Sequence, residues 1–369
     1  MSKTKVVSLF SGCGGLDLGF KHADYDVIWA NDFLKDACET YKRNIGDHIV
    51  HGDINTIKVE DIPKADVLVG GPPCQSFSLV GKRDPNDERS NLVWSYLNVL
   101  KHVNPKIFLL ENVTGILSAK NPDGTKVIDN LIAAFEELGY KTSVNKLNAA
   151  DYGVPQRRQR VFIVGNRIGQ NIDKPAPTNS EDGESLPRWV SAYEALSDLP
   201  ETNETGIFSY AKDTDNDYQK LMRKEANGSG TLHITPYASA KDNELIRHIP
   251  PGGNYVNVPD SVATQRILNF KKTGGRTTTY GRLSEDKPSY TLNTHFNRLN
   301  VGCNIHYKTD RLISLREGLR IQSFPDDFQV YSSSKRNYYV QIGNAVPPLL
   351  GQAWAEYFKP FLKAKKQTT

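Results

Sequence analysis

The sequence predicts an α/β protein in which a doubly wound sheet covered by helices is followed by a second, smaller domain. Three observations predict this fold class. Short apolar runs alternate with stretches of helical periodicity between residues 5 and 165, polar or glycine residues come where these runs end, and the composition changes after Asn166. Alternation of this kind is typical of a parallel sheet whose crossover helices cover its faces.

Five apolar runs rich in β-forming residues predict the strands of the sheet. They are KVVSLF (5–10), DVIWAND (26–32), ADVLVGG (65–71), KIFLLENV (106–113) and RVFIVGN (160–166). The stretches 34–46 and 127–140 place apolar residues three and four apart, as crossover helices do. Ligands of doubly wound sheets bind beyond the carboxyl ends of the strands, so we expect the chemistry at that edge.

The second domain is predicted by composition rather than by periodicity. Residues 173–187, DKPAPTNSEDGESLP, are polar and rich in proline, which is typical of a linker. From residue 186 to about 300, clusters of glycine, lysine, arginine and tyrosine replace helical patterns. An amphipathic helix is predicted from Leu312 through SLREGLRIQSF, and a second one in the final AVPPLLGQAWAEYFKPFLKA.

Composition narrows the class of protein. At 369 residues the chain is long enough for two domains that each bury a core, and no apolar run is long enough to cross a bilayer. The four cysteines form no CxxC pair or Cys/His cluster, so neither a zinc site nor a disulfide framework is predicted, and a reducing, cytoplasmic setting is expected. The net charge of +4 suits a polyanionic partner without requiring one.

The loop after the first apolar run carries glycines at positions 12, 14 and 15. Glycines there let the backbone turn tightly and approach a ligand, and the helix that follows offers free N–H groups. Because three residues separate Gly15 from Gly19, the spacing departs from the dinucleotide fingerprint, which favours another nucleoside ligand over a nicotinamide cofactor. Asp32 ends the second run and could accept hydrogen bonds from ribose hydroxyls, and Asp53 could face an adenine amino group. Taken alone, each is also a common loop or capping residue.

Cys74 follows the apolar run at residues 65–71 in the stretch GPPCQSFS. Pro72 and Pro73 prevent helix and ladder pairing just before it, which predicts a thiol at a strand terminus in a loop that faces ligand. The alternative is a buried structural cysteine, which is the interpretation we favour for the other three cysteines. The polar stretch after it contains Gly81 and Pro85 and predicts a mobile lid.

Two further motifs place charged side chains near the same edge. Glu111 ends the run 106–113, where a carboxylate serves either as a proton donor or as a helix cap or ion-pair partner. Arg158 and Arg160 lie two apart at the entry to the run 160–166, so they are predicted to share one face. There they could serve an anionic or carbonyl-bearing substrate, the alternative being a solvated basic edge.

Six motifs, taken together and in order, resemble those of the DNA cytosine-5 methyltransferases. They are SLFSGCGGLDLGF, GGPPCQSFS, ENV, VPQRRQRVFIVG, LREGLRIQSFPDDF and QIGNAVPP, and they extend across nearly the whole chain. The resemblance implies a Rossmann-like sheet that binds S-adenosylmethionine (SAM) in a catalytic domain at residues 1–180 plus 341–369. It implies a target-recognition domain and hinge at residues 186–340.

The resemblance also assigns roles to individual residues. Cys74 matches the nucleophile, Glu111 the acid at cytosine N3, and Arg160, with Arg158 beside it, the contact to the cytosine carbonyl. The positions that match cofactor contacts are Phe10, Gly12, Gly14, Leu16, Asp32 (where the family often has Glu), Phe33, Asp53, Ile54, Pro73, Asn344 and Ala345. The candidate DNA contacts are Gln75, Ser78, Lys82, Arg83, Arg276, Tyr280 and Arg282. No metal is expected.

The function predicted from this resemblance is methylation of a cytosine flipped out of double-stranded DNA, by a monomeric bacterial enzyme of a restriction-modification system or an orphan relative. The resemblance leaves open whether a cognate restriction endonuclease acts on the same site. Two alternatives are an RNA-directed member of the same fold and a catalytically inactive binding paralogue. Intact Cys74, Glu111 and Arg160 argue against the second. The DNA sequence recognised is not encoded in any motif.

Overall fold

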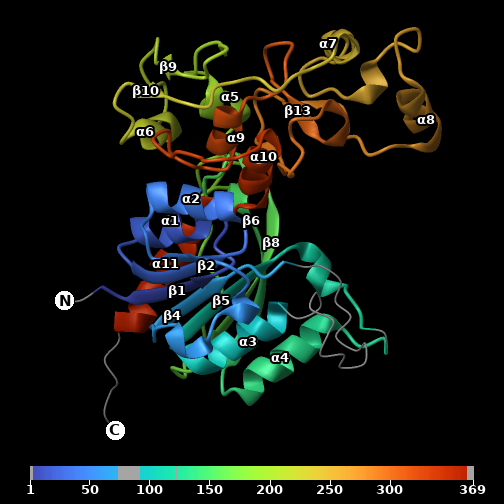
Figure 1. Ribbon diagram of the computed structural model, residues 1–369. Coiled ribbons are helices and arrows are strands. Elements are labelled where there is room, and N and C mark those ends of the chain that lie inside the picture. Colours follow the sequence, from blue (N-terminus) through green and yellow to red (C-terminus); the bar gives the residue numbers. More distant parts are fainter. Residues whose placement is uncertain (1–2, 74–91, 122, 364–369) are drawn as a thin grey trace. The chain divides into compact units, whose positions relative to one another are not determined.

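The computed structural model describes residues 3–73, 92–121 and 123–363 (Figure 1). The chain forms two compact units. Unit 1 comprises Met1–Asn148, Gln159–Ala176 and Leu350–Thr369, and unit 2 comprises Ala149–Arg158 and Pro177–Leu349. Unit 2 therefore includes residues 149–158, 177–180 and 341–349, which the sequence assigned to the catalytic domain. The functional division of the chain stays a prediction.

Unit 1 contains a seven-stranded sheet of order β3-β2-β1-β4-β5-β8-β6. Its strands are β1 (Lys5–Leu9), β2 (Asp26–Asp32), β3 (Ile49–His51), β4 (Val67–Gly70), β5 (Ile107–Asn112), β6 (Lys141–Asn148) and β8 (Gln159–Asn166). The first five are parallel, whereas β8 is antiparallel to both β5 and β6. The doubly wound α/β class is confirmed. The expected parallel direction is wrong for β8, because a strand buried on both faces has the same apolar run in either direction.

Helices cover the two faces of this sheet (Figure 1). They are α1 (Gly15–His22), α2 (Lys35–Asn44), α3 (Leu92–Val103), α4 (Val127–Glu137) and α11 (Pro348–Lys363). Successive strand residues alternate between faces. Phe108 of β5 joins the core beneath α3 and α4, where its ring lies 4.5 Å from that of Phe135. Phe162 of β8 packs on the other face against Trp354 of α11, with ring centroids 5.3 Å apart.

Unit 2 has little regular structure, as its composition predicted. Its helices are α5 (Ala192–Leu196), α6 (Asp217–Arg223), α7 (Ala240–Arg247), α8 (Gln265–Thr273), α9 (Leu315–Ile321) and α10 (Lys335–Asn344). Its strands are β7 (Gln156–Arg157), β9 (Phe208–Ser209), β10 (Ser229–Gly230), β11 (Gly281–Arg282), β12 (Ser289–Tyr290) and β13 (Cys303–Ile305). Because these strands are short, most main-chain groups of unit 2 need hydrogen-bond partners outside a sheet.

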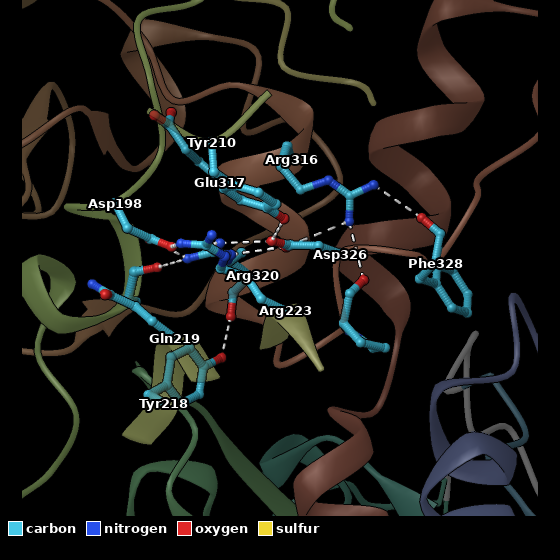
Figure 2. Close-up of polar contacts among 12 residues, drawn as sticks. Asp198, Tyr210, Tyr218, Gln219, Arg223, Arg316, Glu317, Arg320, Asp326 and Phe328 are labelled. Carbon is cyan, nitrogen blue, oxygen red and sulfur yellow. Dashed lines mark hydrogen bonds and ion pairs between the residues drawn. The ribbon is translucent and has the colours of Figure 1, made fainter. Parts of the chain in front are cut away.

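Helix α9 is predicted to be amphipathic, yet all seven of its residues are buried. Figure 2 shows the reason: Arg320 from α9 bonds to Asp198 and Asp326, at 2.6 Å in each case. The hydroxyl of Tyr210 donates to the same Asp326 carboxylate. Charged residues at helical spacing therefore predicted a solvated face that, in the structure, is a buried ion network.

No helix in the part of the chain that the structure describes is long and apolar enough to cross a membrane.

Candidate active site at the carboxyl edge of the sheet

The glycine loop after β1 adopts backbone conformations that favour glycine. Gly12 and Gly14 have φ values of 57° and 89°. A Cβ at Gly14 would lie 2.1 Å from Cδ1 of Ile45, so a larger residue would have to displace that side chain as well as adopt a strained φ. A Cβ at Gly12 would meet nothing within 4 Å, which leaves open space beside this part of the loop. Phe10 also has a positive φ, of 54°, and packs partly against the core.

Asp32 connects this loop to the end of β2. Its Oδ2 accepts a hydrogen bond of 2.8 Å from the Gly12 N–H, and its Oδ1 accepts one of 2.8 Å from the Leu34 N–H. Burial raises the pKa of the Asp32 carboxyl, and these two backbone donors oppose that shift. Each carboxylate oxygen keeps a lone pair, so hydroxyl donors of a ligand could still bind.

The remaining predicted cofactor contacts of unit 1 differ in exposure. The ring of Phe33, next to Asp32, is 75% exposed, which leaves an aromatic face available to a ligand. Asp53 caps a short helical turn by accepting a 2.9 Å hydrogen bond from the Asn55 N–H. Leu16 and Ile54 are buried. The predicted contacts Gly12, Asp32 and Asp53 thus lie at the ends of three adjacent strands.

Glu111 is the next-to-last residue of β5 and forms an ion pair with Arg160 of β8, with 2.8 Å between Oε1 and Nε. Both side chains keep 12% of their surface exposed. A Cβ at Gly71 would lie 2.9 Å from Glu111 Oε2, so the glycine lets the main chain approach this carboxylate. Next to it, the side chain of Asn112 donates to the carbonyl of Pro72 at 3.1 Å. Pro72, just ahead of Cys74, is therefore in direct contact with Asn112 of the ENV motif.

Several predicted residues fall outside the described part of the chain. These are Cys74 and the candidate DNA contacts Gln75, Ser78, Lys82 and Arg83, together with the predicted lid. Pro73, the last described residue before Cys74, is exposed.

Arg158 and Arg160, predicted to share one face, have different partners. Arg158 is completely buried in unit 2, where its guanidinium donates to the carbonyls of Leu292 and Gly343 at 3.0 and 2.8 Å. The two-residue period does not apply here, because Arg158 lies between β7 and β8 rather than in one strand with Arg160. These contacts support a structural role for Arg158.

Asn344 and Ala345 lie at the carboxyl end of α10 in unit 2. Asn344 is exposed. A Cβ at the preceding Gly343 would lie 2.6 Å from the main chain of Asn293, so this end of α10 requires a glycine.

The three candidate DNA contacts of unit 2 also differ in exposure. Arg276 is exposed on a turn after α8, whose Thr279 N–H donates to the Arg276 carbonyl at 2.9 Å. Tyr280 is buried. Arg282 is buried too, and it donates to the carbonyls of Ile249, Ile246, His306 and Thr309 and to the carboxylate of Asp310. Because these bonds occupy its guanidinium, Arg282 holds the loop together, and its burial, like that of Tyr280, does not support the predicted DNA contact.

Sequence reasoning missed three buried polar residues near this edge. Asn31 and Asn112 each adjoin a predicted acid, and their amides bind main-chain carbonyls. Asp17 is buried in α1 and accepts a 2.7 Å hydrogen bond from Ser8 Oγ. Burial raises the pKa of Asp17 to about 6. The signal available was a polar residue inside an apolar run, as in LDLGF and WAND.

The order of the sheet, the glycine loop and the acids at successive strand ends define a doubly wound α/β domain with a ligand site at its carboxyl edge. The sequence model of the C-5 cytosine-specific DNA methylases matches residues 4–359. The chain belongs to this family, and it is a DNA cytosine-5 methyltransferase.

Individual relatives agree with this assignment. The chain is 38% identical to the type II methyltransferase M.NgoFVII of Neisseria gonorrhoeae over 353 residues, which cover 94% of this chain and 84% of that protein. It is 33% identical to the type II methyltransferase M.FnuDI of Fusobacterium nucleatum, covering 98% and 96% of the two chains. The Dnmt2 methyltransferase of S. pombe, at 18% identity, shares the fold, with a TM-score of 0.57 over 97% of this chain and 99% of that one.

Proposed function

We propose that this enzyme transfers a methyl group from SAM to C5 of a cytosine that is flipped out of double-stranded DNA. The observation that carries the proposal is the Glu111–Arg160 ion pair, which lies at the carboxyl edge of the sheet in contact with the loop that leads to Cys74. The edge also offers groups that suit the adenosine part of SAM: the acids Asp32 and Asp53 for hydroxyl and amino donors, and the exposed ring of Phe33.

The chemistry needs a nucleophile because C5 of cytosine is too weakly nucleophilic to take a methyl group unaided. In the proposed mechanism the Cys74 thiolate adds to C6, which makes C5 enamine-like. Glu111 donates a proton at N3 and Arg160 stabilises the carbonyl side, so that charge does not accumulate on the ring. SAM supplies the methyl group when bound. A base then removes the C5 proton, the bond between sulfur and C6 breaks to release the thiolate, and the N3 proton returns to Glu111.

The cytosine must leave the stack before Cys74 can reach C6, which costs a few kcal/mol of unstacking. Arg276 is the exposed cation of its loop that we propose to contact the duplex. The relatives' description as type II methyltransferases supports a role in protecting DNA within a restriction-modification system.

A methyl-transfer assay with labelled SAM and duplex DNA tests this proposal. We expect Cys74→Ala to lose methyl transfer while it still binds SAM, and Glu111→Gln to slow transfer by about 10²-fold or more, as loss of a general acid does. Full activity of Cys74→Ala would contradict the mechanism. An RNA acceptor run in parallel tests the RNA-directed alternative, and bisulfite sequencing of DNA from expressing cells identifies the target site.

A further inference from the structure

Asn31 lies at the carboxyl end of β2, between the two loops that flank Asp32. Its side chain is 1% exposed, and its amide nitrogen donates to the carbonyls of Val50 and Gly52 at 3.0 Å each. Both N–H groups of the amide are thus used on one segment, the end of β3 and the turn that follows it.

The main chain of Asn31 makes a contact on the opposite side. Its carbonyl accepts a 2.9 Å hydrogen bond from the N–H of Ser11 in the glycine loop. The next residue, Asp32, repeats this pattern: its carboxylate accepts from Gly12 and its carbonyl accepts from the Gly52 N–H at 3.0 Å. Asn31 therefore connects the loops after β1 and β3 through a single buried residue.

The turn that Asn31 holds leads directly to Asp53 and Ile54. Gly52 has a φ of 153°, and a Cβ added there would meet nothing within 4 Å, so the turn is not fixed by packing around Gly52. Hydrogen bonds help to set the position of Gly52 relative to Asp32, and two bonds to this segment come from the Asn31 amide.

We propose that Asn31 is a positioning residue for the cofactor site, which holds the Asp53 turn at the correct distance from Asp32 so that both can engage adenosine at once. This inference rests on the proposed use of SAM at this edge. Asn31 itself makes no contact with the reacting atoms in this proposal. Its loss should weaken cofactor binding and leave the chemical step largely intact once the site is filled.

The test compares Asn31→Ala with Asn166→Ala. Asn166 is a matched control because it is equally buried, at 2% exposed, and its amide also donates to two main-chain carbonyls, those of Lys141 and Gln170. Asn166 is the last residue of β8 and pairs with Ile107, the first residue of β5, so it lies at the edge of the sheet away from the proposed cofactor site. The measurements are the Kd for SAM by calorimetry, the KM for SAM and kcat on duplex DNA, and the Kd for duplex DNA without cofactor.

For Asn31→Ala we expect the Kd and KM for SAM to rise about tenfold, as freeing a turn held by two hydrogen bonds predicts. We expect kcat at saturating SAM and the Kd for DNA to change by less than about twofold. For Asn166→Ala we expect the thermal midpoint to fall and the Kd for SAM to stay unchanged. Gly52→Ala, which strains the same turn from its main chain, should raise the Kd for SAM as Asn31→Ala does.

An unchanged Kd for SAM in a folded Asn31→Ala variant would overturn the inference, as would an equal loss of affinity in Asn166→Ala. If Asn31→Ala does not fold, Gly52→Ala decides, since unchanged SAM affinity there overturns the inference as well. A wild-type enzyme that does not bind SAM would instead contradict the proposed function itself.

Discussion

Unit 1 and unit 2 bury acidic side chains in different surroundings. In unit 1, Asp17 makes a hydrogen bond with Ser8, and among the described residues it forms no ion pair; burial raises its pKa to about 6. In unit 2, burial also favours a higher pKa for Glu317. The nearby Arg311 and His306 outweigh this effect and hold the pKa of Glu317 well below its usual range. Asp326 behaves in the same way, because Arg320 and Arg316 lower its pKa in spite of burial.

This difference follows from the amount of regular structure in each unit. The seven-stranded sheet pairs its own main-chain groups along long ladders, so its interior can be almost entirely apolar. Unit 2 has strands of two or three residues, and its carbonyls need other donors. The buried arginines among the described residues are Arg158, Arg282, Arg316 and Arg320. All belong to unit 2, and each donates to main-chain carbonyls. A planar guanidinium has five N–H donors and can therefore bond to several of these carbonyls at once.

The largest loss of stability is expected for Arg320→Met, which removes the central cation of the ion network in unit 2. The substitution leaves two buried carboxylates, Asp198 and Asp326, without their main cation, which costs about 3–5 kcal/mol of folding free energy. Urea unfolding followed by tryptophan fluorescence should show a large fall in the transition midpoint. A change below 1 kcal/mol would mean that the ion network does not hold unit 2 together.

Asp17→Asn should have the opposite effect, in unit 1 and only at high pH. Because folding raises the pKa of Asp17, its favourable contribution is present below about pH 4 and is lost as pH rises through about 6. Removing the charge should therefore stabilise the protein by about 2–3 kcal/mol at pH 8. At pH 4 the variant and the wild type should unfold alike. Thermal midpoints across this range measure the difference, and equal midpoints at pH 8 would refute the explanation.

His306 gives unit 2 a pH dependence of the other sign. Burial lowers the pKa of His306 to about 4, so its neutral form is present in the folded protein and stability is lost as pH falls below about 6.5. At pH 5 the loss should reach about 2 kcal/mol. His306→Asn keeps an acceptor for the N–H groups of Lys308 and Thr309 and removes the titration. The variant should lose less stability than the wild type between pH 7 and pH 5, and parallel curves would argue against this role.

The smallest effect is expected for an exposed ion pair of unit 2. Lys220 and Asp217 lie 3.0 Å apart on α6 with most of their surface in water. Lys220→Met should change stability by no more than about 0.5 kcal/mol. This variant is the control for Arg320→Met, since both remove a cation from a salt bridge of the same unit. A large loss of stability in Lys220→Met would show that burial does not explain the difference between exposed and buried ion pairs.

The apolar strands of unit 1 were predictable because burial on both faces leaves a continuous run, as in KIFLLENV. The edge strand β6 was not predicted, because KTSVNKLN is mostly polar and only two of its residues are buried. The acids at strand ends could be placed from topology alone, since parallel strands bring their carboxyl ends to one edge. The partners of Arg158 and Arg282 could not be predicted, because they are main-chain carbonyls of distant segments and no sequence pattern indicates them.

The chain order of unit 2 has a consequence for exchanging this unit between related enzymes. Segment 177–349 leaves out Ala149–Arg158, although this decapeptide belongs to the same compact unit. The decapeptide supplies strand β7, which pairs with β12, and the Arg158 guanidinium, which binds the carbonyls of Leu292 and Gly343. A chimera made with a single contiguous donor segment would inherit these two carbonyls without the guanidinium that binds them. Functional hybrids should therefore require two cassettes, and natural recombination between such genes should preserve both together.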